Sequence, residues 1–181
     1  KKITLHLSGT NKDYAYSCVP QKDNTYRAVE AYMQKYNTNG ADIYLQKNIP
    51  LSSGMGGSSA CASATLLAME ELYKMDADLV ELANALGSDT AYLLKGGWAR
   101  LRGRGDSVEY LPLKNKLEFA VIYSEGGVNT AECFKLYDSA LESVKQSANV
   151  EGLIESLNGE ELLYSECKNA LEPYACEMNP N

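Results

Sequence analysis

The stretch that decides the fold is "IPLSSGMGGSSACASATLLAM", residues Ile49 to Met69, where a loop of glycines and serines runs directly into a helical pattern. The start of a helix carries unpaired amide N–H groups and the positive end of the helix dipole, so it can bind an anion. Glycine lets that anion approach the backbone closely. The alternative is a tight strand-to-helix turn with no ligand, and the loop alone does not decide between the two.

Two common phosphate-binding motifs do not fit this loop. A Walker loop needs GxxxxGK[ST], and no lysine follows these glycines. The dinucleotide fingerprint needs GxGxxG, and Ser59 stands at its third glycine. If the loop binds phosphate, it uses backbone amides and serine hydroxyls.

Hydrophobic periodicity outlines the elements around the loop. Asn39-Gly40 is expected to close the first helix, Asp76 or Asp78 to cap a later one, and Gly87 to end it. The pattern predicts strands over residues 2–9, 41–48, 96–105 and 117–125, and helices over 23–36, 58–73, 76–87, from Asn129 or Thr130 onward, and in the remainder from 146.

Composition narrows the function classes. The chain has 181 residues and a net charge of -7 without a basic stripe, so neither a nucleic-acid groove nor an anionic membrane surface is expected. No window reaches the roughly 18 apolar residues of a membrane span. The five cysteines are widely spaced and never form CxxC, which is typical of reduced thiols and indicates a cytoplasmic protein. The one histidine, His6, is expected to be a packed or surface residue of a strand.

The loop resembles a family motif. Pro-x-x-x-Gly-x-Gly-Gly-Ser-Ser-Ala, starting at Pro50, is similar to the phosphate-binding motif of the GHMP kinases, which phosphorylate small molecules. The segments "VPQKDNTYRA", "LGSDTAYLLKGGWARLRGRGD" and "GGVNTAECF" follow the order and spacing of the branch that phosphorylates 4-diphosphocytidyl-2-C-methyl-D-erythritol in non-mevalonate isoprenoid biosynthesis. Together the four segments cover about residues 19–134.

The resemblance implies an α+β protein with the GHMP kinase fold. Residues 1–113 would be the N-terminal ATP-binding domain, which resembles domain 2 of ribosomal protein S5, and 114–181 would begin the C-terminal domain. The family's Ala-Lys-x-Asn strand, its Asp-Gly-Tyr-His turn and its C-terminal glycine motif are not found, so the fold is expected to be incomplete at both ends. The loop is also one glycine short, and Ala60 stands where the family has Asp.

The resemblance also assigns site residues. It implies ATP and Mg²⁺ as cofactors, a small-molecule alcohol as substrate, Asp89 as the catalytic residue, and Phe134 and Thr130 as substrate-binding residues. Ser58 would also reach the magnesium ion. The expected nucleotide-binding residues are Asn24, Thr25, Lys47, Pro50, Gly54, Met55, Gly56, Gly57, Ser58 and Ser59.

The residues alone support Asp89 in part. It follows a glycine that ends a helix, and a carboxylate placed where the chain enters an apolar, strand-like stretch suits a base for a hydroxyl group. The alternative is a carboxylate that caps the next element. Arg100, Arg102 and Arg104 are either a phosphate cluster or one exposed strand face, and the latter is favoured.

Three functions stay open. The first is a kinase for the substrate named above or for another alcohol, such as homoserine, mevalonate or a sugar. The second is a nucleotide-binding fragment or degenerate kinase without catalysis, and the third is an interaction domain without a nucleotide. A monomer or a homodimer is expected.

Overall fold

The computed structural model describes residues 2–9, 19–50, 52–112, 117–122, 126–140, 149–159, 165 and 167–180. The chain forms two compact units, Lys1–Leu51 with Met55–Leu111, and Ser52–Gly54 with Pro112–Asn181. The grouping of Ser52–Gly54 with the second unit is not foreseen by the sequence, and the amide of Val128 donates to the Ser52 carbonyl there (3.1 Å). The assignment of the two units to the two expected domains stays a prediction.

The first unit opens with a strand–helix–strand arrangement. Strand β1 (Thr4–Gly9) pairs in parallel with β2 (Asp42–Lys47), and the short helix η1 (Pro20–Lys22) and helix α2 (Asn24–Tyr36) lie between them in sequence. The two strands and helix α2 confirm the elements predicted over residues 2–9, 41–48 and 23–36. The predicted end at residue 36 is confirmed, but the helix is closed by Asn37 and not by Asn39-Gly40. Asn37 adopts the left-handed conformation (φ 52°), which asparagine tolerates.

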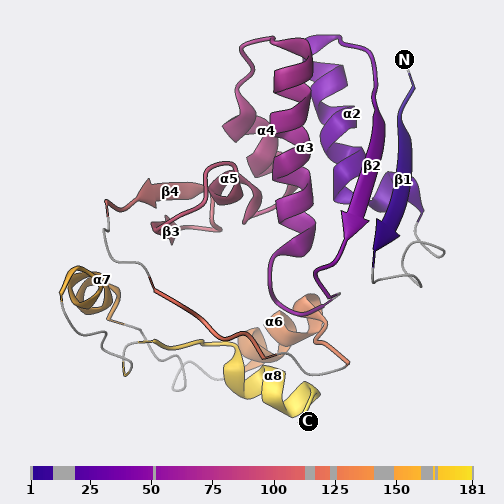
Figure 1. Ribbon diagram of the computed structural model, residues 1–181. Helices are drawn as coiled ribbons and strands as arrows, with labels where there is room; N and C mark the ends of the chain where they lie inside the picture. The colour runs from indigo at the N-terminus through magenta and orange to yellow at the C-terminus, as the bar shows by residue number, and fades with distance from the viewer. Residues whose placement is uncertain are drawn as a thin grey trace. The chain divides into compact units, whose positions relative to one another are not determined.

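Helices α3 (Gly57–Tyr73) and α4 (Leu79–Leu86) complete the core of this unit. Figure 1 shows α2 and α3 running side by side. Asp78 caps α4 by accepting from the Glu81 amide, and Gly87 follows its last residue, as the sequence predicts. The buried core consists of Ala28, Val29, Tyr32, Ala62, Leu66, Met69, Leu82, Ala83, Leu86 and Ala91.

A short helix and a two-stranded ribbon close the first unit. The stretch after Asp89 is the helix α5 (Thr90–Leu93), so the strand-like interpretation is wrong there. The reason is tertiary, because consecutive Thr90 and Ala91 are both buried instead of alternating. Strand β3 (Ala99–Arg102) pairs antiparallel with β4 (Ser107–Tyr110).

The regular elements that the structure describes in the second unit beyond residue 112 are helices. This unit contains α6 (Thr130–Ser139), α7 (Val150–Asn158) and α8 (Glu172–Met178), and Asn129 caps α6 as predicted. Tyr137 of α6 and Tyr174 of α8 meet edge to face at 5.9 Å. The strand expected over 117–125 is not formed at 117–122, where Phe119 and Ile122 are exposed, and 123–125 lie outside the described residues. None of the described helices combines the length and apolar character that crossing a membrane requires.

Candidate active site

Helix α3 begins without a capping side chain. Its N-cap residue is Gly56, in the left-handed conformation (φ 64°), which has no side-chain oxygen to accept from the first turn. The other described helices of eight or more residues are capped by Asp23, Asp78, Asn129 and Asn149. The helix leaves the amide N–H groups of Gly57, Ser58 and Ser59 without an intrahelical acceptor. These amides and the helix dipole therefore offer a site for an anion.

The loop is held against neighbouring elements of the first unit. A Cβ on Gly57 would lie 3.1 Å from Cγ2 of Ile49, and one on Gly56 would lie 3.8 Å from Cδ1 of Leu93 in α5. Met55 is exposed, and Pro50 is half-buried before the loop. Gly54 groups with the second unit, so within the first unit the loop runs from Met55 into α3.

Asp89 stands at the N-cap position of α5 but does not cap it. Its side chain is exposed and accepts no hydrogen bond from the amides of α5. Its contact with another side chain is a long hydrogen bond from Oγ of Ser88 (3.5 Å). The capping interpretation is thus right about the position and wrong about the bond. The carboxylate is left available to a ligand.

Buried contacts join the segment of Asp89 to the start of α3. The hydroxyl group of Ser63, whose residue is 1% exposed, lies 2.9 Å from the Ser59 carbonyl and 2.8 Å from the Thr90 carbonyl. A Cβ on Gly87 would lie 3.8 Å from Oγ of Ser59. The structure therefore brings the glycine loop and Asp89 together, as the sequence expects of a single site.

Lys47 lies in a buried ion pair that the sequence does not show. Its Nζ donates to Oδ2 of Asp23 at 2.6 Å, and the two side chains are 11% and 1% exposed. Oδ1 of Asp23 caps α2 by accepting from the Thr25 amide (2.8 Å). Thr25 itself is fully buried, so a direct contact with adenine stays a prediction that nothing in this geometry supports.

Cys61, in the second turn of α3, interacts electrostatically with Lys47 and Asp23. Burial raises the pKa of its thiol, while Lys47 lowers that pKa and Asp23 raises it. The ion pair therefore lies near the beginning of α3, where the sequence places the nucleotide.

Asn24 connects α2 to the glycine loop. Its Nδ2 donates to Oγ of Ser58 (3.0 Å), and its Oδ1 accepts from Arg27 (2.9 Å). Because a guanidinium group can only donate, the amide oxygen must face Arg27 and the nitrogen must face Ser58. The Ser58 hydroxyl is thus an acceptor in this bond, and its own proton is directed elsewhere.

A comparison with protein families matches the part of the chain that carries this site. Residues 23–98 match the family described as "GHMP kinases N terminal domain". The match contains both Asn24 and Asp89 and the whole start of α3. Residues 23–98 are a GHMP kinase N-terminal domain.

Curated relatives extend the similarity beyond this GHMP kinase domain. The 4-diphosphocytidyl-2-C-methyl-D-erythritol kinase of Clostridium novyi is 33% identical over 94% of this chain and 63% of its own length. The enzyme of the same name from Desulfitobacterium hafniense is 37% identical over 86% of this chain and 55% of its own length. The chain thus spans between half and two thirds of these relatives.

Solved structures share the fold. A crystal structure of 4-(cytidine 5'-diphospho)-2C-methyl-D-erythritol kinase matches with a TM-score of 0.67 and 26% identity, over 99% of this chain and 63% of that one. A homoserine kinase from Cytophaga hutchinsonii matches with a TM-score of 0.74 and 21% identity over the same shares, which shows the fold alone. The expected GHMP kinase fold is confirmed.

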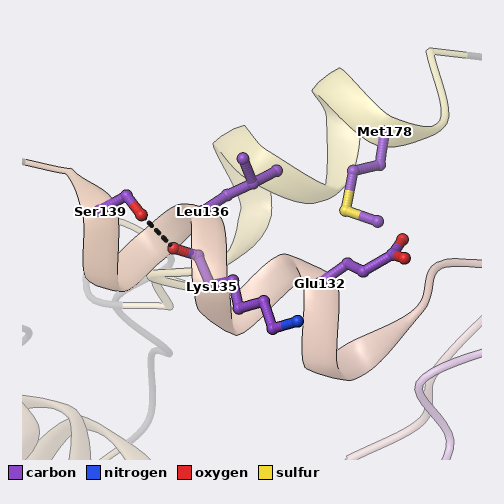
Figure 2. Close-up of a pocket in the computed structure, with 5 residues that line it drawn as sticks. All are labelled: Glu132, Lys135, Leu136, Ser139 and Met178. Carbon is purple, nitrogen blue, oxygen red and sulfur yellow. Dashed lines mark hydrogen bonds between the residues drawn. The ribbon is translucent and has the colours of Figure 1, made fainter.

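The expected substrate residues belong to the second unit, outside the GHMP kinase domain. Thr130 begins α6, and Phe134, 48% exposed, lies one turn later. A cavity of about 360 Å³ between α6 and α8 is lined by Glu132, Lys135, Leu136, Ser139 and Met178, which Figure 2 shows, and by neither of these two residues. Their substrate contacts stay predictions.

The three arginines at and after β3 do not share one strand face. Arg100 and Arg102 lie in β3, whereas Arg104 is in the following turn, where its amide donates to Asp106 (2.8 Å). This bond lowers the pKa of Asp106. Arg102 forms an exposed pair with Glu109 (3.5 Å), of the kind that adds little stability. The expectation of one exposed face is therefore wrong for Arg104.

Sequence reasoning missed three residues of the site, Asp23, Arg27 and Ser63. Asp23 could have been found, because an Asp before a helical pattern is a common cap. Ser63 could not have been found, because nothing in the sequence pairs its hydroxyl with a carbonyl 27 residues away.

Proposed function

We propose that the protein transfers the γ-phosphoryl group of ATP to a hydroxyl group of 4-diphosphocytidyl-2-C-methyl-D-erythritol. The observation that carries this proposal is the uncapped start of α3 next to the exposed carboxylate of Asp89, which caps no helix. Phosphoryl transfer asks a protein mainly for phosphate alignment and a placed group for the attacking hydroxyl. The names of the curated relatives support the choice of acceptor.

Phosphate binding would rest on backbone groups. The amides of Gly57, Ser58 and Ser59 would donate to phosphate oxygens, and the Ser58 proton, turned away from Asn24, would add a hydroxyl donor. Lys47 would act through its ion pair with Asp23 and not as an unpaired cation. Asn24 would contribute by orienting Ser58, and an adenine contact of Asn24 or Thr25 would be a further role.

Asp89 would hold the acceptor hydroxyl and take its proton. Its exposure gives a substrate access, and its backbone is held from within, because the Thr90 amide donates to the Gly87 carbonyl (3.1 Å) and the Leu93 amide to the Asp89 carbonyl (3.1 Å). Phe134 and Thr130 would bind the acceptor.

Magnesium would arrive with the nucleotide. Among the described residues, no group of three or more His, Cys, Asp or Glu side chains could hold a metal ion. Mg²⁺ is usually held by phosphates, waters and one or two protein oxygens, and Ser58 could supply such an oxygen. The ion would neutralise charge on the transferred phosphoryl group. The reaction would take place in the cytoplasm, with the protein as a monomer or homodimer.

An acceptor screen tests the proposal. The protein is incubated with ATP, Mg²⁺ and either 4-diphosphocytidyl-2-C-methyl-D-erythritol, homoserine, mevalonate or a sugar, and ADP release is measured. We expect turnover with the first acceptor and a loss of about a hundredfold or more in Asp89→Asn. Turnover with only one of the other alcohols would show that this alcohol is the acceptor and that the proposed acceptor is wrong. ATP binding without transfer to any acceptor would favour a non-catalytic nucleotide-binding protein.

A further inference from the structure

Ser63 connects the two halves of the proposed site from inside the core. It lies on α3, two turns from the glycine loop, and is 1% exposed. Its hydroxyl oxygen is 2.9 Å from the carbonyl of Ser59 and 2.8 Å from the carbonyl of Thr90. Ser59 belongs to the first turn of α3, and Thr90 directly follows Asp89.

The single hydroxyl proton has a preferred acceptor. The Ser59 carbonyl can already receive the amide of Ser63 within the helix, four residues on. The Thr90 carbonyl lacks the corresponding bond, because the amide of Leu94 donates to Ala91 instead (3.4 Å). A buried carbonyl without a donor destabilises the fold. Donation of the Ser63 proton to the Thr90 carbonyl therefore stabilises the fold more than donation to the Ser59 carbonyl.

The segment of Asp89 is also supported from its other side. A Cβ on Gly105, in the turn between β3 and β4, would lie 2.6 Å from the Ser88 carbonyl, so the turn packs directly on the residue before Asp89. Asp89 therefore stands between two anchored neighbours. Within the part of the chain that the structure describes, its side chain has only the long contact with Ser88 to direct it.

We propose that Ser63 is a positioning residue, which sets the location of Asp89 relative to the glycine loop through its hydrogen bond to the Thr90 carbonyl. The proposal rests on the proposed function for its kinetic consequence, but the hydrogen bond itself is independent of that function. Because Ser63 is buried, it would touch neither ATP nor the acceptor. Its loss should affect the transfer step and leave ATP binding intact.

Ser63→Ala removes the hydroxyl without adding volume, and Ser63→Thr keeps it. A matched control lies on the same helix, because Oγ1 of Thr65 donates to the Cys61 carbonyl (2.7 Å). Like Ser63, Thr65 places its hydroxyl against the carbonyl of the residue four positions earlier, but its hydroxyl has no second acceptor on α5. Thr65→Val therefore removes a helix-internal bond and leaves Asp89 untouched.

The kinetic arm measures kcat with both substrates saturating, and the Kd of ATP by calorimetry. We expect kcat to fall about tenfold in Ser63→Ala, because misplacement of a catalytic group by a fraction of an ångström is costly. The Kd of ATP should stay within about twofold of the unsubstituted protein. Ser63→Thr and Thr65→Val should keep kcat. A folded Ser63→Ala with unchanged kcat, or an equal fall in Thr65→Val, would overturn the proposal.

The second arm does not depend on turnover. Hydrogen exchange followed by mass spectrometry should show faster exchange in the peptide that covers residues 87–94 of Ser63→Ala, with the middle of α3 unchanged. Unchanged exchange there would overturn the proposal even if the protein has no kinase activity. If Ser63→Ala does not fold, Ser63→Cys keeps the volume with a weaker donor and should show the same two effects. If the unsubstituted protein transfers no phosphate while exchange changes as expected, the proposed function fails and the structural link holds.

Discussion

Asp23 offers a sharp test of the energetics beneath the site. Its carboxylate is 1% exposed and does two jobs, because Oδ1 caps α2 through the Thr25 amide (2.8 Å) and Oδ2 pairs with Nζ of Lys47 (2.6 Å). Asp23→Asn distinguishes the contribution of the ion pair from that of the helix cap. The amide oxygen of asparagine caps a helix about as well as aspartate, so this variant loses the charge and keeps the cap.

The magnitude follows from burial. The Lys47 side chain is only 11% exposed, so Asp23→Asn leaves a largely desolvated ammonium group without its carboxylate. Removing one partner of a buried pair costs about 3–5 kcal/mol of the free energy of unfolding. Asp23→Ala also loses the cap and should cost about 1 kcal/mol more. The double variant Asp23→Asn with Lys47→Met should be more stable than Asp23→Asn, because the buried charge is gone.

Urea titration followed by the fluorescence of Trp98 is a suitable assay. Trp98 is the only tryptophan of the sequence and lies in the first unit, so its signal reports the unfolding of that unit. Arg102→Met, which breaks the exposed pair with Glu109, is the matched control and should change the free energy of unfolding by less than about 0.5 kcal/mol. A cost below about 1 kcal/mol for Asp23→Asn would refute this reasoning. A double variant whose loss of unfolding free energy equals the sum of the losses in Asp23→Asn and Lys47→Met would also refute it.

Two further predictions concern the helix start and the core. Gly56 and Gly96 have nearly the same left-handed backbone (φ 64° and 67°) and no crowding side chain, so Gly56→Ala and Gly96→Ala should each cost about 1–2 kcal/mol of stability. Calorimetry should show weaker ATP binding for Gly56→Ala only, and equal weakening in both would contradict a phosphate site at α3. The hydroxyl of Tyr32 donates to Glu70 (2.7 Å) and is the main cause that lowers the pKa of Glu70. A lowered carboxyl pKa stabilises the fold above the unfolded-state pKa, and this contribution is lost as the pH falls through the folded-state value. The stability difference between the unsubstituted protein and Tyr32→Phe should therefore shrink between pH 7 and pH 3, and a constant difference in urea titrations would speak against it.

Local patterns predicted the elements that local chemistry determines. The start of α3 follows from "GMGGSSA", and the caps at Asp78 and Asn129 follow from residue type and spacing. The sequence failed where tertiary packing decides, as at α5, where two consecutive residues are buried. The closing of α2 by Asn37 in place of Asn39-Gly40 and the absence of a strand at 117–122 are further failures.

The candidate site shows the same division. The glycine loop and Asp89 were chosen from the sequence, and the structure brings them together. The Asp23–Lys47 pair and the Ser63 bond join residues 24 and 27 positions apart, and no periodicity encodes such a contact. The roles of the nucleotide-binding and substrate-binding residues stay predictions, because they depend on ligands.

The glycine at the start of α3 has a consequence for selection on this protein. A serine or aspartate cap with an extended backbone would make the free protein more stable by about 1 kcal/mol, and its side chain would then occupy the amides that an anion needs. With Gly56 in place, a phosphate group bound as proposed would complete the helix. Ligand binding and folding would therefore be linked, and the melting temperature should rise with ATP concentration, because a bound ligand stabilises the fold by RT ln(1 + [ATP]/Kd). Mutations that stabilise the chain at this position would be selected against in a cell, because they would compete with the ligand.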